Sequence, residues 1–259
     1  MPAYLSELFN LAGKTAAVIG GGGHLCSEMA TAMANCGVTV ALLDKNTRNL
    51  KIVAGKIKRC GAAVSCARLD VTDRNAHQKA LADIIRKFGR LDILINGAGI
   101  NAPTPFFRIS QKEWQSILDV HMTGTFLACQ VFGKYMVEHR RGSIINISSS
   151  AAGPPLSKAF TYSVAKAGIK NLTQNLAREW APFGVRVNAL RPGFFPTDWS
   201  RKHFITPSRG RAILRHTPVG RYGKPSELAG AVLWLASDAA SFVTGAEITV
   251  DGGFSCMTI

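Results

Sequence analysis

The chain contains 259 residues, of which 47% are hydrophobic and 18% are charged. This composition supplies enough apolar surface for a large core, which excludes a disordered chain, and the length fits one or two domains. The 31 Lys and Arg residues outnumber the 16 Asp and Glu residues, and the net charge of +15 attracts nucleic acid, membrane phosphates, acidic proteins or anionic metabolites.

Short apolar runs alternate with longer helical segments along the whole chain. The predicted strands, in chain order, are Thr15–Ile19, Val38–Leu43, a short one before Asp70, Leu91–Ile95, Ser143–Ile147, Arg186–Leu190 and Glu247–Val250. A glycine run follows the first strand, and a helix is predicted from about residue 27 to residue 35. Continuous apolar strands separated by helices are typical of a parallel sheet with right-handed crossovers.

The sequence therefore predicts an α/β fold with one doubly wound parallel sheet of the Rossmann type and helices on both faces. No linker or internal repeat divides the chain, so residues 1–259 are expected to form a single domain. The stretch 192–218 is the least regular, and a loop of that length in a compact domain is usually functional.

Targeting and cysteine signals predict a cytoplasmic protein. The segment Met1–Glu7 lacks a basic stretch followed by an apolar one, so a secretory signal is not expected. No apolar run approaches the roughly 18 residues of a membrane helix. The six cysteines contain no CxxC pair and are expected to be reduced core residues, with neither a disulfide framework nor a metal site.

The glycine run Gly20–Gly23 predicts a nucleotide site. Glycines between a strand and a helix permit a tight turn and a close approach of the backbone to a pyrophosphate. Asp44 ends the next strand, 24 positions after Gly20, where an acid can bind ribose hydroxyls and repel a 2′-phosphate. This favours NAD over NADP, although Lys45 is a cation that could accept a phosphate. Alternatively, Asp44 is a solvated turn residue beside a glycine-rich loop.

Tyr162 and Lys166 are four residues apart and share one face of a predicted helix. A phenol has an ordinary pKa of about 10, and a nearby ammonium favours the phenolate, which suits acid–base work near neutral pH. Alone, this spacing also fits a helix tyrosine beside a solvated lysine.

Further motifs follow the predicted strands: Asp70-Val71, Asn96-Gly97-Ala98-Gly99, Ser149, Arg191-Pro192-Gly193 and Val250-Asp251-Gly252-Gly253. With the glycine run and the tyrosine–lysine pair, this ordered set resembles the short-chain dehydrogenase/reductase family over nearly the whole chain. The resemblance implies that Ser149, 13 residues before Tyr162, binds the substrate oxygen. It also implies that Tyr162 exchanges a proton and that Lys166 binds the nicotinamide ribose and lowers the tyrosine pKa.

The same resemblance implies a nicotinamide dinucleotide, NAD before NADP, bound at the strand ends. Asp70 would hold the adenine amino group, Val71 would pack near its ring, Asn96 would steady the strand beside the ribose, and Thr197 would contact the carboxamide. The complete expected set is Gly20, Gly22, Gly23, His24, Leu25, Asp44, Asp70, Val71, Asn96, Gly97, Ala98, Tyr162, Lys166, Pro192, Gly193 and Thr197.

The sequence departs from the family pattern at three places. Ile19 stands where threonine is common, and His24 and Cys26 occupy glycine positions. Either Gly23 supplies the permissive backbone one position early, or Cβ atoms at these two positions crowd the pyrophosphate. His121 replaces the asparagine that positions a water in the proton relay. We hypothesise that its imidazole preserves the relay and adds pH dependence, the alternative being a purely structural substitution.

The positive charge gathers around the expected substrate lid, about residues 194–217. Nine bases and one acid, Asp198, lie between Arg186 and Lys224. An anionic substrate would be clamped by Arg201 or Lys202, with Ser149 and Phe194 also in contact, unless this is only a solvated basic face. Segments 192–196, 201–202 and 250–255 resemble the branch typified by D-mannonate oxidoreductases, which implies a sugar acid or polyol such as D-mannonate and D-fructuronate.

Two other functions use the same features differently. A 3-oxoacyl carrier-protein reductase would need a basic surface for its acidic partner, but it normally uses NADPH, which Asp44 disfavours. A non-catalytic dinucleotide-binding or nucleic-acid-binding module would explain the altered glycine motif, but the intact catalytic residues argue against it. We expect a small-molecule substrate, no nucleic-acid or membrane partner, and a homotetramer packed through helices at 115–137 and 162–181.

Overall fold

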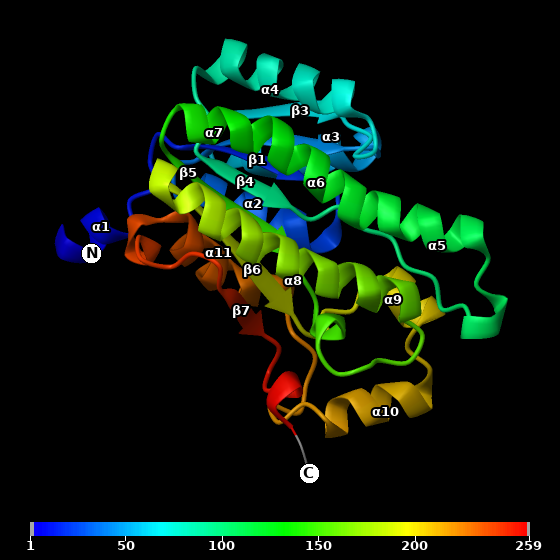
Figure 1. Cartoon of the computed structure of the whole chain (residues 1–259). Coiled ribbons are helices and arrows are strands. Elements are labelled where there is room, and N and C mark those ends of the chain that lie inside the picture. Colours follow the sequence, from blue (N-terminus) through cyan, green and yellow to red (C-terminus); the bar gives the residue numbers. More distant parts are fainter. Residues whose placement is uncertain (1–2, 258–259) are drawn as a thin grey trace.

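A computed structural model of the chain describes residues 3–257, without the side chains of residues 198 and 199. A seven-stranded sheet in the order β3-β2-β1-β4-β5-β6-β7 forms its centre, and every strand pair is parallel (Figure 1). The strands are β1 (Thr15–Ile19), β2 (Thr39–Asp44), β3 (Val64–Arg68), β4 (Ile93–Asn96), β5 (Gly142–Ile147), β6 (Val185–Pro192) and β7 (Glu247–Val250). The predicted α/β, doubly wound, Rossmann-type sheet is confirmed.

Helices cover both faces of the sheet. They are α1 (Ala3–Leu8), α2 (His24–Asn35), α3 (Thr47–Arg59), α4 (Arg74–Phe88), α5 (Gln111–Leu118), α6 (Gly124–Ala128), α7 (Lys134–Glu138), α8 (Phe160–Trp180), α9 (Asp198–His203), α10 (Pro207–Arg215) and α11 (Ala229–Ala236). The core on one face takes side chains from α2, α3 and α11, and the core on the other takes them from α4, α6, α7 and α8. Π-helical turns at Asp119–Thr123 and Cys129–Gly133 join α5, α6 and α7 into one continuous rod.

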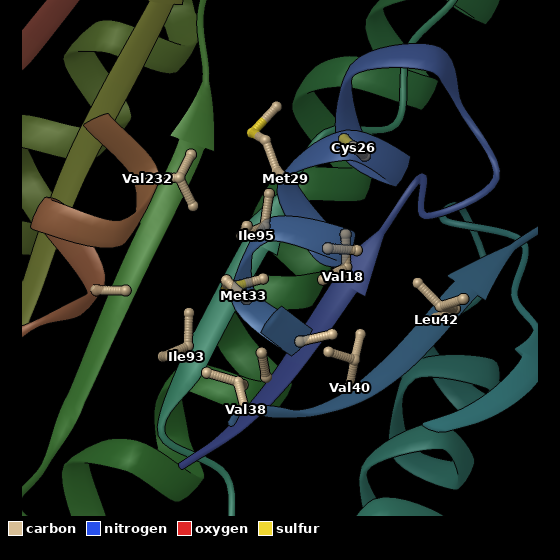
Figure 2. Close-up of a cluster of buried hydrophobic side chains, with 14 of the residues drawn as sticks. Val18, Cys26, Met29, Met33, Val38, Val40, Leu42, Ile93, Ile95 and Val232 are labelled. Carbon is tan, nitrogen blue, oxygen red and sulfur yellow. The ribbon is translucent and has the colours of Figure 1, made fainter. Parts of the chain in front are cut away.

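The strands form because apolar residues continue without a polar break, so both faces of each strand can be buried. In β1 all five residues are buried, and successive side chains alternate between the two cores. Val18 packs with Met29 and Met33 of α2 and with Ile95 of β4, as Figure 2 shows. Ile19 packs in the opposite core. This packing fixes the strand ends, where the candidate site lies.

The predicted strand bounds agree with the structure to within two residues, whereas two other predicted elements differ more. Helix α2 begins at His24 instead of about residue 27, because Gly23 is its N-cap and the three residues after it already have helical backbone. The stretch predicted to be irregular contains α9 and α10. Thr206 caps α10 and Pro207 starts it, while Phe204 and Ile213 bury apolar side chains, so this segment has a packed inner side.

All six cysteines are free thiols, but only Cys26 and Cys129 are buried, so the expected core position is wrong for the other four. Within residues 3–257, no helix is both long enough and apolar enough to cross a membrane.

Candidate active site

A cavity of about 660 Å3 opens at the carboxyl ends of the strands, beside β1 and β4, where the strand order reverses direction. Open parallel sheets bind ligands at this crevice because the loops on either side diverge there. The cavity is lined by the loops after β1, β4, β5 and β6 and by residues of α8, α9 and α10. The four predicted catalytic residues, Ser149, Tyr162, Lys166 and His121, all line it.

The predicted cofactor residues fall into two groups. Beyond the catalytic pair on α8, those that line the cavity are Gly20, Gly23, His24, Leu25, Gly97, Gly193 and Thr197. Those outside its lining are Gly22, Asp44, Asp70, Val71, Asn96, Ala98 and Pro192. The second group therefore lies outside the cavity wall.

Gly20 makes the turn between β1 and α2 possible. Its φ of 79° is disfavoured for other residues, and a Cβ there would lie 2.7 Å from the backbone nitrogen of Ala98. Gly23, which the sequence offered as a permissive backbone position, has a φ of −79° in the extended region, where other residues are also allowed. Its role is that of N-cap, and no side chain caps the helix, which leaves the first N–H groups of α2 directed to the cavity.

His24 and Cys26 lie in the first turn of α2, where helical backbone accommodates their Cβ atoms. Cys26 is buried and faces Gly97, where a Cβ would come within 2.1 Å of its Sγ. Burial raises the pKa of the Cys26 thiol to about 12, so it stays protonated. The sulfur therefore occupies space beside the β4 loop, and the expected crowding by Cys26 falls on Gly97.

Asp44 stands beside the glycine turn. Its carboxylate accepts hydrogen bonds from the N–H groups of Gly22 at 3.0 Å and Asn46 at 2.8 Å. Lys45, which the sequence left as a possible phosphate acceptor, places Nζ 3.0 Å from Oδ2 of Asp70. Hydrogen bonds from Lys45 and then Thr72 lower the pKa of Asp70 to about 2. Lys45 is thus paired with Asp70, and the side chain of Asp44 lies next to the turn.

Asn96 anchors a buried chain of hydrogen bonds. Its Nδ2 donates to Oδ1 of Asn146 on β5 at 2.8 Å, and Nδ2 of Asn146 donates to the hydroxyl of Thr173 on α8 at 2.9 Å. The chain ties β4 and β5 to the helix that carries the catalytic tyrosine and lysine. Val71 is buried at the end of its own loop, where its carbonyl oxygen lies 2.9 Å from Nε2 of His77.

Ser149, Tyr162 and Lys166 meet between the end of β5 and the start of α8. The Ser149 hydroxyl hydrogen-bonds with Tyr162 and accepts from the N–H of Ala151 at 3.1 Å. Nζ of Lys166 lies 5.6 Å from the centre of the Tyr162 ring and donates to the carbonyl of Ile147 at 2.5 Å. One strand end and one turn of helix thus bring the three groups together.

Burial shifts both titratable groups toward their neutral forms. It raises the pKa of Tyr162, against the opposing effect of the Ser149 hydrogen bond, and it lowers the pKa of Lys166 to about 8. The expected net lowering of the tyrosine pKa is therefore wrong for this structure, because desolvation of the phenolate dominates. At neutral pH the phenol keeps its proton, and Lys166 is still mostly an ammonium.

His121 lies in the π-helical turn between α5 and α6, a rare conformation that recurs at functional sites. Its side chain is 1% exposed, and Nε2 lies 2.8 Å from the carbonyl oxygen of Ile100. Its ring meets Tyr162 edge-on, with 5.2 Å between the ring centres. The substituted residue is therefore in direct contact with the catalytic tyrosine.

Burial, and then the positive charge of Lys166, lowers the pKa of His121 to about 3. The expectation that His121 titrates near neutrality is therefore wrong, because a buried imidazolium beside an ammonium is doubly disfavoured. The ring stays neutral and keeps one donor and one acceptor nitrogen. Nδ1 is buried and has no hydrogen-bond partner among the residues that the structure describes.

The loop after β6 closes one side of the cavity. Pro192 accepts a hydrogen bond from the Ser150 hydroxyl at 3.2 Å, and the N–H of Gly193 donates to the carbonyl of Val250 at 3.0 Å. Phe194 lines the cavity beside it. Thr197 is the N-cap of α9, and its hydroxyl accepts a hydrogen bond from the N–H of Ser200 at 3.0 Å. The residue that was expected to contact the nicotinamide carboxamide therefore also caps this helix.

An ion-pair network contacts the residues on either side of Ser149. The Ser148 hydroxyl donates to Glu247 on β7 at 2.7 Å, and Arg191 on β6 pairs with the same carboxylate at 3.2 Å. The Arg191 and Glu247 side chains are only 11% and 10% exposed. Arg191 also donates to the carbonyl of Ser150 at 3.4 Å. Glu247 is not predictable from the sequence, since 99 positions separate it from Ser148 and no motif joins them.

The structure places the expected substrate cations differently from the sequence prediction. Arg201 and Lys202 are exposed on α9 and do not belong to the cavity lining. The guanidinium of Arg201 instead lies 5.4 Å from the ring centre of Tyr222. Of the nine basic residues between 186 and 224, Arg209 on α10 is the one in the lining. A proline at the first position of α10 was the available signal for that helix.

Comparisons with known proteins agree with this geometry. The model of the family described as "Enoyl-(Acyl carrier protein) reductase" matches residues 25–255. The chain is 40% identical to the oxidoreductase UxuB of Bacillus subtilis (strain 168), over 95% of this chain and 96% of that protein. It is 33% identical to gluconate 5-dehydrogenase of Gluconobacter oxydans (strain 621H), over 96% of this chain and 97% of that protein.

Among solved structures, a gluconate 5-dehydrogenase from Burkholderia cenocepacia J2315, in complex with NADP and tartrate, matches with a TM-score of 0.93. Its sequence is 29% identical, and the match covers 98% of this chain and all of that one. The likeness therefore extends over nearly the whole fold.

Proposed function

This chain belongs to the short-chain dehydrogenase/reductase family and is an NAD(P)-dependent oxidoreductase. From this premise we propose that it interconverts a secondary alcohol and a ketone of a sugar acid or polyol with NAD(H). D-mannonate and D-fructuronate are the first pair to test. The observation that carries the proposal is the meeting of Ser149, Tyr162 and Lys166 on the wall of one cavity.

When bound, the nicotinamide supplies or accepts a hydride, and the proton is left to the chain's own side chains. Because burial raises its pKa, Tyr162 holds a proton at neutral pH and gives it to the substrate oxygen when a ketone is reduced. Ser149, already hydrogen-bonded to Tyr162, donates to the same oxygen and orients it. The Lys166 ammonium favours the phenolate that remains, and His121 is proposed to continue the proton relay as a neutral ring.

The residues fit a dinucleotide at the glycine turn. Gly20 permits the tight turn against the backbone of Ala98, and the N-terminus of α2, which no side chain caps, would offer N–H groups to a pyrophosphate. Asp44 beside that turn would accept the adenosine ribose hydroxyls and repel a 2′-phosphate. Since Lys45 is paired with Asp70, we propose NAD as the preferred form.

The sugar-acid or polyol class is supported by the compared proteins. Two of them are named gluconate 5-dehydrogenases, and one was crystallised with tartrate, a dicarboxylic hydroxy acid. The net charge of +15 would draw such anions toward the protein. We propose a small anionic substrate on these grounds, with an exposed lid at about residues 194–217 controlling entry.

The matching family model carries a carrier-protein name, and the basic surface would suit an acidic carrier protein, so a 3-oxoacyl thioester reductase is the second candidate. Asp44 counts against it, since such enzymes normally use NADPH. A catalytically inactive dinucleotide-binding module would retain the fold without turnover.

We also propose a homotetramer. Phe126 on α6 and Val164 on α8 are each 45% exposed, and these helices belong to the two segments expected to pack across two-fold axes. Burying such apolar side chains against a second copy would stabilise the assembly. Light scattering tests this, and a monomeric mass would contradict it.

The function is tested by following NADH and NADPH absorbance with sugar acids, polyols and acetoacetyl thioesters. The proposal expects turnover with sugar acids or polyols and NAD(H), abolished by Tyr162→Phe. Turnover of thioesters with NADPH alone would favour the second candidate. NAD binding without turnover of any substrate would leave the non-catalytic module.

A further inference from the structure

Arg209 brings a positive charge into an otherwise mostly apolar part of the cavity. It lies on α10 and shares the lining with Leu156, Phe194, Phe204 and Ile205. Two other arginines of the same helix, at positions 211 and 215, are exposed and outside the lining. The orientation of α10 therefore singles out one of its three arginines for the cavity.

Neutral oxygens hold the Arg209 guanidinium in place. It donates to the Ser157 hydroxyl at 3.1 Å, to the Ser157 carbonyl at 2.7 Å and to the Phe204 carbonyl at 2.8 Å. A guanidinium has five N–H donors, so these contacts leave two for a ligand. The contacts also tie α10 to the loop between β5 and α8, which orients the group before a ligand arrives.

No carboxylate described by the structure balances the charge of Arg209. It forms no ion pair with the carboxylates whose side chains the structure describes. Partial burial lowers its pKa from the usual value, although the group stays charged. An anion would satisfy both the charge and the remaining N–H donors of this half-buried guanidinium. A carboxylate suits it best, because its two oxygens match the planar geometry of the guanidinium.

We propose that Arg209 is the specificity-determining residue for acidic substrates and binds the substrate carboxylate in the same cavity in which Ser149 and Tyr162 hold the reacting carbon–oxygen group. The inference rests on the proposed oxidoreductase function. It replaces Arg201 and Lys202 as the carboxylate ligand and leaves them to attract anions from the exposed side of α9.

The main test compares one acid with one neutral polyol of equal chain length, D-gluconate and D-glucitol. Kinetics with NAD are measured for the wild type and for Arg209→Gln. Because a hydrogen-bonded charge is lost, KM for gluconate is expected to rise about 10- to 100-fold, while KM for glucitol and both kcat values change less than about threefold. An equal rise of KM for both substrates would overturn the inference.

Two matched variants separate charge recognition from the structural contacts. Arg211→Gln removes an exposed charge from the same helix and is expected to leave the gluconate-to-glucitol ratio of KM unchanged. Ser157→Ala removes one acceptor that orients Arg209 while keeping the cation, and it is expected to raise KM for gluconate less than Arg209→Gln does and to leave KM for glucitol unchanged. If Arg211→Gln reproduces the selective loss seen with Arg209→Gln, the carboxylate role is refuted.

Calorimetric binding in the presence of NADH makes the test independent of turnover. The wild type is expected to bind gluconate more tightly than glucitol, and Arg209→Gln is expected to lose that difference. Equal wild-type affinities overturn the Arg209 inference even if polyols are oxidised. The proposed function fails separately, if selective gluconate binding occurs without turnover of any alcohol or ketone.

Discussion

Replacing His121 with asparagine tests the most informative departure from the family pattern. The imidazole is buried against Ile100 and Tyr162, and its pKa falls from 6.5 in an exposed chain to about 3 in the folded protein. Between these two values the unfolded chain binds a proton that the folded chain does not bind. Folding stability therefore rises with pH across this window and is lost as the pH falls below about 6.5.

The size of the effect follows from the width of the window. One pH unit of differential protonation changes the free energy of unfolding by about 1.4 kcal/mol. Lowering the pH from 6.5 to 5 should cost the wild type about 2 kcal/mol that His121→Asn does not lose. His77, whose pKa burial also lowers, is present in both proteins and cancels in the comparison.

The assay is denaturant unfolding of both proteins at matched concentration and at several pH values between 5 and 7.5. At pH 7.5, His121→Asn should be less stable than the wild type, because the smaller side chain leaves space beside the α5–α6 turn. The difference in the free energy of unfolding should become smaller as the pH falls. If the free energies of unfolding of the two proteins differ by the same amount at every pH, the argument from the burial of His121 is refuted. Since His121 is neutral throughout this range, the two rate-versus-pH profiles should have the same shape, and a difference centred near pH 6.5 would restore the titrating relay.

Three further predictions concern the catalytic tyrosine, the ion-pair network and the β4 loop. Tyr162→Phe removes the proton donor and should lower kcat by about 100-fold or more with unchanged circular dichroism, and near-normal turnover would remove Tyr162 from the mechanism. Glu247→Gln leaves the buried Arg191 guanidinium without its charge partner and should cost about 3 kcal/mol in chemical unfolding, whereas a loss below about 1 kcal/mol would mean that solvent screens the pair. Gly97→Ala should destabilise the protein by about 1–3 kcal/mol because its Cβ meets the Cys26 sulfur, and adding Cys26→Gly should restore most of the loss; additive effects would contradict that contact.

Patterns local in the sequence predicted the sheet and the meeting of Ser149, Tyr162 and Lys166 at one place. The strand Thr15–Ile19 is found with the predicted bounds, because five consecutive buried residues leave little choice of register. Tyr162 and Lys166 lie on one helix face, and Ser149 meets them, because helical spacing and a strand end fix their positions. The start of α2 is three residues earlier than predicted, because the helix begins directly after the glycine run, with Gly23 as its N-cap.

Features that depend on the environment were not predictable in this way. The direction of the Tyr162 pKa shift and the depressed pKa of His121 both follow from burial, which residue types alone do not report. The choice of Arg209 over Arg201 depends on how α9 and α10 turn after residue 196, in a segment rich in proline and charge. The Thr206-Pro207 pair was the local signal that this segment is helical.

The hydrogen bond between Ser148 and Glu247 has a consequence for how the enzyme is made. The two residues are 99 positions apart, and Glu247 belongs to the last strand of the sheet. During synthesis, residue 247 is made after all the other strands, so its hydrogen bond with Ser148 forms only when the chain is nearly complete. The loop that carries Ser149 gains its acidic support only once β7 docks, a contact of long sequence separation that forms slowly. Catalytic competence is therefore among the last properties that the folding chain acquires.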